Sequence, residues 1–303
     1  MKEQTWQGVF TALATPYSRA GDIEWGQLRE LIDMLLEDGV NGFVVAGSTG
    51  EYYSQSLDER RELFRQVKKH VAGRATLVAG TSSLNAAETF DLTADAKEIG
   101  YDGCMVLPPV YCLPSPAETK RYFEQVAAIG LPVMIYNNPA RVGVGLSAAQ
   151  TAELASIPNI VAYKESARDL YAIADTYYAT RDRLAHFAGL EPYASALLSR
   201  GAKGIVSTIS NLAAREVVNY YKACRANDAD ALARNQQVID QLYHLLARSG
   251  LSNFAFVKTA MSAIGRPGGA TRAPHLMGSA EQAAQFGEAI AQIYERAGIP
   301  LKR

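Results

Sequence analysis

The sequence feature that most constrains the fold is a series of eight short apolar runs rich in Val, Ile and Phe. Each run ends in Gly, Pro, Ser or Asn and is followed by a longer segment of helical periodicity. The runs are apolar throughout, which is typical of strands buried on both faces of a parallel sheet. They begin at Gly8, Gly42, Ala75, Gly103, Pro132, Ile160, Leu184 and Gly204.

Eight units of strand followed by helix predict an α/β fold, a closed parallel (β/α)8 barrel of the TIM type. An open doubly wound sheet is the alternative. A nucleotide-binding sheet of that kind carries a GxGxxG turn after its first strand, whereas the run from Gly8 to Pro16 continues directly into Tyr17 and Ser18. We therefore expect the barrel.

The chain continues well beyond the eighth run. Helical periodicity returns in residues 213–226, 228–249, 253–264 and 280–297, with a loop over 266–274. We expect residues 1–223 to form the barrel that carries the active site and residues 224–303 to form a C-terminal helical extension packed on it. Surplus helices of this kind typically cover one face of a barrel or build an oligomer contact, which we favour over a separate functional domain.

The charge balance argues against a polyanionic partner. Thirty Lys and Arg residues face 31 Asp and Glu residues, so no positive excess is available to hold nucleic acid or an anionic membrane. Residues 1–18 lack the pattern of a signal peptide, and no apolar stretch is long enough to span a bilayer. The three cysteines have no CxxC spacing, which argues against a disulfide framework. We expect a cytoplasmic protein with no nucleic-acid and no membrane partner.

The active site of such a barrel lies at the C-terminal ends of the strands, so the polar residues that close the runs are the candidates. Lys164 directly follows Ile160–Tyr163 and lies within an apolar strand. Burial disfavours the charged form of a lysine and leaves a nucleophilic amine, as a Schiff-base lysine requires. The alternative is that Lys164 forms a buried ion pair with Glu165 or another carboxylate.

Tyr136 closes the fifth run, one strand away from Lys164. Adjacent strands bring the two side chains together, and the phenol can pass protons to and from a carbinolamine or enamine. A lone Tyr at a strand end is more often a packing residue. Its value as a candidate therefore comes from the pairing with Lys164.

Two loops offer groups that suit carboxylates. Gly47–Glu51, the GSTGE motif after the second run, combines small residues, two hydroxyls and backbone amides at a tight turn. Arg141, shortly after Tyr136, adds a guanidinium that can hold a carboxylate bidentately. An ordinary glycine-rich loop and a solvent-exposed arginine are the alternatives for these two features.

The sequence predicts neither a metal site nor a cofactor. Among His70, His186, His244 and His275 only His186 lies in a strand, where we expect a core histidine, and no ligand cluster stands at the strand ends. The loops after the seventh and eighth runs lack the glycine-rich turn of barrel phosphate sites. A phosphorylated substrate or a flavin is therefore not favoured.

Three motifs together resemble the dihydrodipicolinate synthase and N-acetylneuraminate lyase superfamily, which comprises class I, pyruvate-dependent lyases. They are GSTGE at 47–51, YNNPAR at 136–141 and YKES at 163–166. The resemblance runs from Gly8 to the last helices. It implies a (β/α)8 barrel with a C-terminal helical extension, assembled as a homotetramer built as a dimer of dimers.

The resemblance also implies residue roles. Lys164 would form the imine with pyruvate or another 2-oxo acid, so that no separate cofactor is needed, and Tyr136 would be the proton shuttle. Gly47, Ser48 and Thr49 would bind the pyruvyl carboxylate, with the Ser48 hydroxyl relaying protons.

Two further positions match the family pattern. Tyr111, in PPVYC, matches the position from which a second tyrosine enters the site of a neighbouring subunit. Val206, in GIVST, matches a strand-eight residue whose backbone lies against the pyruvyl group.

The second substrate is harder to assign. Arg141 matches the arginine with which the synthases hold the carboxylate of aspartate semialdehyde, so we expect pyruvate to condense with that small aldehyde. Against this, GSTGEYYSQSLDER resembles the lyase branch, and NFAFVK at 253–258 lacks the prolines of the synthases' NPxPxK segment. A retro-aldol lyase or dehydratase of a 2-oxo sugar acid or a hydroxy-oxoglutarate stays open, as do a non-catalytic 2-oxo-acid-binding barrel and a metal-dependent aldolase.

Overall fold

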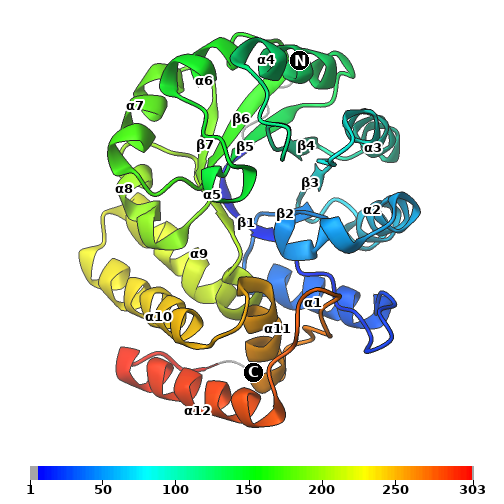
Figure 1. Cartoon of the computed structure of the whole chain (residues 1–303). Helices are drawn as coiled ribbons and strands as arrows, with labels where there is room; N and C mark the ends of the chain where they lie inside the picture. Colours follow the sequence, from blue (N-terminus) through cyan, green and yellow to red (C-terminus); the bar gives the residue numbers. More distant parts are fainter. Residues whose placement is uncertain (1–5, 302–303) are drawn as a thin grey trace.

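The computed structural model describes residues 6–301, and a closed barrel of eight parallel strands lies at its centre (Figure 1). Each strand pairs with the next, and β8 closes the barrel on β1. The strands are β1 (Gly8–Ala12), β2 (Gly42–Val45), β3 (Thr76–Gly80), β4 (Gly103–Val106), β5 (Val133–Asn137), β6 (Ile160–Glu165), β7 (Ala185–Ala188) and β8 (Gly204–Ser207). Each lies within one of the eight predicted runs, and the (β/α)8 fold is confirmed.

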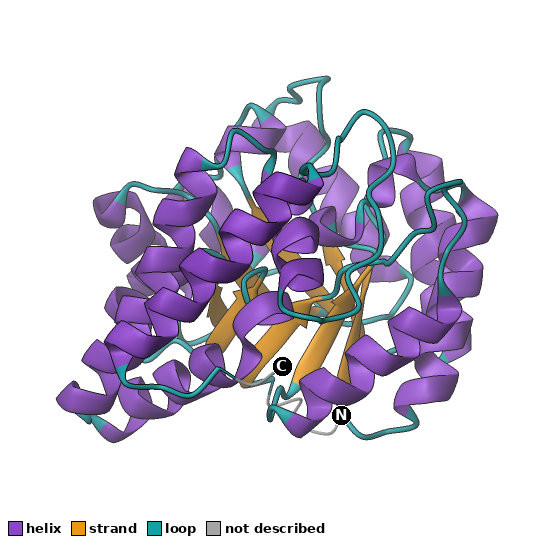
Figure 2. Ribbon diagram, turned by 90° about the horizontal axis from the view of Figure 1, so that it is seen from below, coloured by secondary structure: helices purple, strands orange, loops and turns teal. Residues whose placement is uncertain are grey.

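Helices surround the strands as an outer layer (Figure 2). Those that connect the strands are α1 (Trp25–Glu37), α2 (Leu57–Val71), α3 (Ala86–Ile99), α4 (Pro116–Ala128), α5 (Pro139–Val142), α6 (Ala148–Leu154), α7 (Leu170–Thr180) and α8 (Ala194–Leu198). Short 3-10 helices follow β2 and β7, namely η1 (Ser48–Gly50), η2 (Tyr52–Ser54) and η3 (Glu191–Tyr193). The outward-facing strand residues and the inner faces of these helices share one large apolar core.

Apolar side chains fill the inside of the barrel, which is a packed core and not a pore. The Phe10 and Phe187 rings meet there with their centroids 5.1 Å apart. They leave no space for a side chain on the neighbouring strands: a Cβ at Gly42 would lie 2.8 Å from the Phe10 ring, and one at Gly204 2.6 Å from the Phe187 ring. Glycine at these two strand positions lets large aromatic residues fill the barrel.

The C-terminal extension consists of helices on one side of the barrel (Figure 1). α9 (Ser210–Ala226) follows β8 and extends three residues beyond the predicted boundary at 223. α10 (Ala229–Arg248), α11 (Asn253–Ala263) and α12 (Ala280–Ala297) follow it, and residues 264–279 connect α11 to α12. All four helical segments expected from the sequence are present.

A buried ion pair fastens the extension to the loop after β2. Lys258 on α11 donates to the Glu51 carboxylate at 2.5 Å and to the carbonyl oxygens of Thr15 and Ala270. The two charged side chains are 1% and 0% exposed. The other Glu51 carboxylate oxygen accepts from the Arg272 backbone N–H at 3.0 Å. The last residue of GSTGE is therefore a structural anchor between the barrel and the extension.

His186 is a core histidine, as the sequence predicted. It is 2% exposed, its Nε2 lies 2.9 Å from the Thr180 hydroxyl, and its ring packs against Tyr163 and Tyr177. Burial lowers the pKa of the imidazole to about 4. His186 therefore stays neutral at physiological pH and takes no part in the site.

Candidate active site

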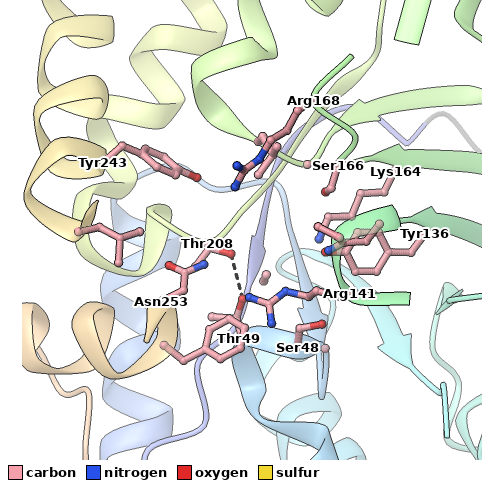
Figure 3. Close-up of a pocket in the computed structure, with 18 of the residues that line it drawn as sticks. Ser48, Thr49, Tyr136, Arg141, Lys164, Ser166, Arg168, Thr208, Tyr243 and Asn253 are labelled. Carbon is pink, nitrogen blue, oxygen red and sulfur yellow. Dashed lines mark hydrogen bonds between the residues drawn. The ribbon is translucent and has the colours of Figure 1, made fainter. Parts of the chain in front are cut away.

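A cavity of about 500 Å³ opens at the C-terminal ends of the strands (Figure 3). Residues at or just beyond the ends of β1, β2 and β4–β8 line it, and α10 and α11 contribute to one side. This is where a barrel of this type holds its active site. Of the predicted residues, the cavity brings together Gly47, Ser48, Thr49, Tyr136, Arg141 and Lys164.

Lys164 and Tyr136 are direct partners in the pairing of β6 with β5. The Lys164 ammonium nitrogen lies 3.9 Å from the centre of the Tyr136 ring, and the two residues are 4% and 5% exposed. The described residues place no carboxylate in ion-pair distance of Lys164. Glu165 instead accepts hydrogen bonds from the Asn137 amide at 2.8 Å and the Ala167 N–H at 2.7 Å. The buried ion pair considered as an alternative for Lys164 is thus not formed.

The Tyr136 phenol has an environment that favours its ionised form. Its oxygen accepts a hydrogen bond from the Asn138 amide at 2.8 Å. Burial by itself would raise the pKa of this phenol, but the Lys164 charge, the Asn138 hydrogen bond and the Arg141 charge outweigh it and lower the pKa below its usual value. A phenol that gives up its proton more easily is suited to proton transfer.

The GSTGE loop presents hydroxyl groups to the cavity from η1. The Thr49 hydroxyl lies 3.0 Å from the Thr208 hydroxyl, which follows β8. The loops after β2 and β8 therefore meet beyond the end of β1, which lies between these two strands in the barrel. Ser48 lines the cavity next to them (Figure 3). Backbone amides and hydroxyls at such a turn form a concave polar surface suited to a carboxylate.

Gly189 leaves room for the buried end of the cavity. Its N–H donates to the Glu165 carbonyl at 2.7 Å, which holds the end of β7 close to β6. A Cβ at this position would lie 2.1 Å from the Ser166 hydroxyl oxygen and 3.0 Å from Cε of Lys164. Glycine is therefore required here for Lys164 and Ser166 to adopt their positions.

Arg141 reaches the cavity from α5. Its guanidinium stacks over the Phe254 ring of α11, with 4.9 Å between the guanidinium carbon and the ring centre. Its side chain makes no hydrogen bond and no ion pair within residues 6–301. A guanidinium held on an aromatic face keeps its N–H groups available for a ligand.

Two predicted residues lie outside the cavity wall. Tyr111 is 88% exposed in the loop between β4 and α4 and does not reach the cavity of its own chain. The Val206 side chain is fully buried in the barrel interior, and the strand-eight loop residue at the cavity wall is Thr208.

The extension contributes cavity residues that the sequence did not reveal. Tyr243 from α10 and Asn253 and Phe254 from α11 line it, together with Arg168 after β6. Tyr243 donates a hydrogen bond to the buried Glu191 carboxylate, which also accepts from the Ser207 hydroxyl at 2.5 Å. Helical periodicity indicates that α10 and α11 exist, but it does not say which barrel loops they meet.

The electrostatic character of the cavity is positive. Lys164, Arg141 and Arg168 line it, whereas no Asp or Glu among residues 6–301 does. The same part of the chain holds no group of three or more His, Cys, Asp or Glu residues arranged to bind a metal. It also has no helix that combines the length and the apolar character needed to cross a bilayer.

Residues 5–293 match the sequence profile of the dihydrodipicolinate synthetase family. The chain belongs to this family. An uncharacterised DapA-like lyase of Rhizobium meliloti is 45% identical over 89% of this chain and 90% of its own length. The 4-hydroxy-tetrahydrodipicolinate synthase of Bacillus subtilis is 35% identical over 88% of this chain and 92% of its own.

A solved structure of the same family has a similar fold. It is the crystal structure of YagE, a prophage protein of Escherichia coli K12, in complex with pyruvate. It shares 29% sequence identity with this chain, covers 95% of it and 98% of its own chain, and superposes with a TM-score of 0.90. The resemblance inferred from GSTGE, YNNPAR and YKES is confirmed, and membership identifies the chain as an enzyme of a lyase family.

Proposed function

We propose that this family member is a Schiff-base-forming lyase that joins pyruvate to an aldehyde, or releases pyruvate in the reverse direction. The observation that carries the proposal is the buried pairing of Lys164 with Tyr136, with 3.9 Å between the Lys164 nitrogen and the ring centre. A buried lysine that has no carboxylate partner among residues 6–301, beside a phenol of lowered pKa, is an arrangement suited to imine chemistry. Relatives that bind pyruvate or carry synthase names support the same chemistry.

The proposed steps use side chains that line the cavity. The Lys164 amine attacks the carbonyl carbon of pyruvate, and water leaves as the imine forms. Tyr136 accepts a proton from the pyruvyl methyl group, which gives the enamine, while Ser48 and Thr49 hold the carboxylate. The enamine carbon then attacks the aldehyde, Tyr136 returns the proton to the new alkoxide, and hydrolysis of the imine frees Lys164.

Arg141 binds a carboxylate of the aldehyde in this proposal. Aspartate semialdehyde, the acceptor expected from the sequence, is one such aldehyde. Cleavage of a 4-hydroxy-2-oxo acid uses the same residues in the reverse order, because a lyase catalyses both directions of its reaction.

We further propose that the reaction needs no cofactor and no metal. The protonated imine nitrogen of Lys164 accepts the electron pair that is released when the enamine forms. Dialysis against EDTA should leave the activity unchanged. Loss of activity that a divalent metal restores would favour a metal-dependent aldolase instead.

The proposal includes a homotetramer, a dimer of dimers, in which Tyr111 of one subunit reaches the cavity of its neighbour. The 88% exposure of Tyr111 supports this, since a large aromatic side chain of that exposure is available for a contact. Light scattering should give four times the mass of the chain, and a monomer in solution would contradict the assembly.

Hydrogen exchange on pyruvate tests the proposed chemistry without knowledge of the aldehyde. In D₂O the enamine step should replace the methyl protons of pyruvate with deuterium, which NMR follows directly. Lys164→Met should abolish the exchange, whereas Lys203→Met, which removes an exposed lysine, should not. A folded enzyme that binds pyruvate without exchange would instead be the non-catalytic 2-oxo-acid-binding barrel.

A further inference from the structure

The cavity has a buried end and an exposed end. Lys164 and Tyr136 form the buried end, at 4% and 5% exposure. Arg141 and Arg168 lie at the exposed end, and both side chains are directed into the same cavity (Figure 3). If the 2-oxo group of the substrate forms an imine with Lys164, the opposite end of the substrate faces the two arginines.

Neither arginine has a charged partner in the described part of the chain. The structure gives the Arg168 side chain no hydrogen bond and no ion pair within residues 6–301, and Arg141 has only the Phe254 ring. Two unpaired guanidinium groups in one cavity repel each other unless an anion binds between them. A carboxylate suits this position, because it accepts N–H donors from more than one side.

Three carboxylates in the loops next to the cavity accept hydrogen bonds from protein groups. Glu165 accepts from Asn137 and Ala167, and Asp169 caps α7 through the N–H groups of Tyr171 and Ala172. Glu191 accepts from Ser207, from the Ile209 N–H and from Tyr243, and it is fully buried. A substrate with an ammonium group would therefore meet three cationic side chains on the cavity wall, where residues 6–301 place no carboxylate.

From this charge pattern we propose that Arg168, together with Arg141, binds a carboxylate at the far end of the second substrate. This inference rests on the proposed function. The substrate class is a 4-hydroxy-2-oxo dicarboxylate or, in the condensation direction, an aldehyde that bears a carboxylate and no ammonium. The inference thus departs from the expectation of aspartate semialdehyde, which carries an ammonium beside its carboxylate.

The cleavage step balances with the groups on hand. The C2 carbonyl of the dicarboxylate condenses with Lys164 and loses water. The C4 hydroxyl gives its proton to the Tyr136 phenolate as the C3–C4 bond breaks, and the electron pair of that bond forms the enamine while the aldehyde leaves. Tyr136 returns the proton to C3, and water hydrolyses the imine to release pyruvate.

The test compares two substrates that differ only at the far end. 4-Hydroxy-2-oxoglutarate carries a carboxylate there, and 4-hydroxy-2-oxopentanoate carries a methyl group. Both release pyruvate, which a coupled lactate dehydrogenase assay detects. The wild-type enzyme should have the higher kcat/KM for the dicarboxylate. Arg168→Gln should lower that value about 10- to 100-fold and change the value for the methyl compound less than about twofold.

Arg183→Gln is the matched control, because Arg183 is an exposed arginine after α7 that does not line the cavity. It should leave both kcat/KM values unchanged. Deuterium exchange on pyruvate should be the same in wild type and Arg168→Gln, since pyruvate alone does not reach the far end, and this exchange also reports that the variant is folded.

The outcomes separate the two proposals. Three results would overturn the role of Arg168 and leave the lyase proposal intact, provided that deuterium exchange is observed. They are equal kcat/KM values for the two compounds, no cleavage of either compound, and an equal effect of Arg168→Gln on both kcat/KM values. Absence of exchange in the wild-type enzyme would overturn the proposed function and this inference with it.

Discussion

Tyr136 and Lys164 are Cα partners across β5 and β6, and the Lys164 nitrogen lies 3.9 Å from the centre of the Tyr136 ring. The lysine charge contributes to lowering the pKa of the phenol, which burial alone would raise. Strand pairing itself thus couples the two residues to which the proposed mechanism gives the nucleophilic and proton-transfer roles. Neither depends on a mobile loop for its position.

Tyr136→Phe should keep this ring beside Lys164 while removing the hydroxyl. We expect kcat to fall about 10²- to 10⁴-fold, the usual contribution of a positioned acid or base, with the imine still able to form. Steady-state kinetics and deuterium exchange on pyruvate measure the loss. Tyr163→Phe is a control, because Tyr163 is buried in the core between strands and helices and does not line the cavity. Equal activity of wild type and Tyr136→Phe would remove Tyr136 from the mechanism.

Gly189→Ala should disturb the lysine end of the cavity. The added methyl group would lie 2.1 Å from the Ser166 hydroxyl oxygen and 3.0 Å from Lys164 Cε, so these side chains must move. We expect deuterium exchange to slow at least about tenfold, because displacement of a catalytic group by about 1 Å is costly. Gly26→Ala places the same methyl group in open space and should have no effect on exchange. An unchanged rate in Gly189→Ala would show that Lys164 tolerates displacement.

Removing only Lys258 from the Lys258–Glu51 ion pair should lower the stability of the protein more than removing both charges. Lys258→Met leaves the Glu51 carboxylate buried without its cation, and we expect the free energy of unfolding to fall by about 3–5 kcal/mol. Urea denaturation measures this change. The double variant Lys258→Met, Glu51→Gln should recover part of the loss, because no unpaired charge remains. A double variant whose loss of stability equals the sum of the losses in Lys258→Met and Glu51→Gln would contradict this account.

His186 should make stability depend on pH. Its pKa falls from 6.5 to about 4 on folding, so the unfolded chain binds more protons between these values. The contribution of neutral His186 to the free energy of unfolding is complete above pH 6.5 and is lost as the pH falls toward 4. At pH 5 the loss is about 2 kcal/mol. Thermal unfolding of wild type and His186→Gln at pH 7 and pH 5 tests this. The wild type should lose more stability than the variant, and parallel losses would show that His186 does not titrate as described.

Much of the barrel and of the candidate site could be predicted from the sequence, because buried parallel strands are apolar throughout and end at the face where such a barrel holds its active site. The polar residues that close the runs ending near Tyr136 and Lys164 were therefore identifiable, and adjacent strands placed them together. The stacking of Arg141 on the Phe254 ring could not be predicted in this way. Phe254 lies on α11, and the periodicity of a helix does not indicate which distant loop it meets.

Gly189 and Arg168 could not be identified as site residues from the sequence, for different reasons. The need for glycine at 189 arises only when β7 approaches Ser166 and Lys164, a contact between separate strand ends. Arg168 looks like any exposed arginine after a strand, and its relevance depends on Arg141 being directed into the same cavity. The role predicted for Tyr111 involves a second subunit and stays a prediction.

The central claim is that Lys164 forms an imine with pyruvate. Incubation with pyruvate and sodium borohydride, followed by proteolysis and mass spectrometry, should find a reduced pyruvyl group on the peptide that contains Lys164. The adduct should be absent without pyruvate and absent from a folded Lys164→Arg variant, which keeps the charge. No adduct on the folded wild-type enzyme, or an adduct on another lysine, would contradict the account.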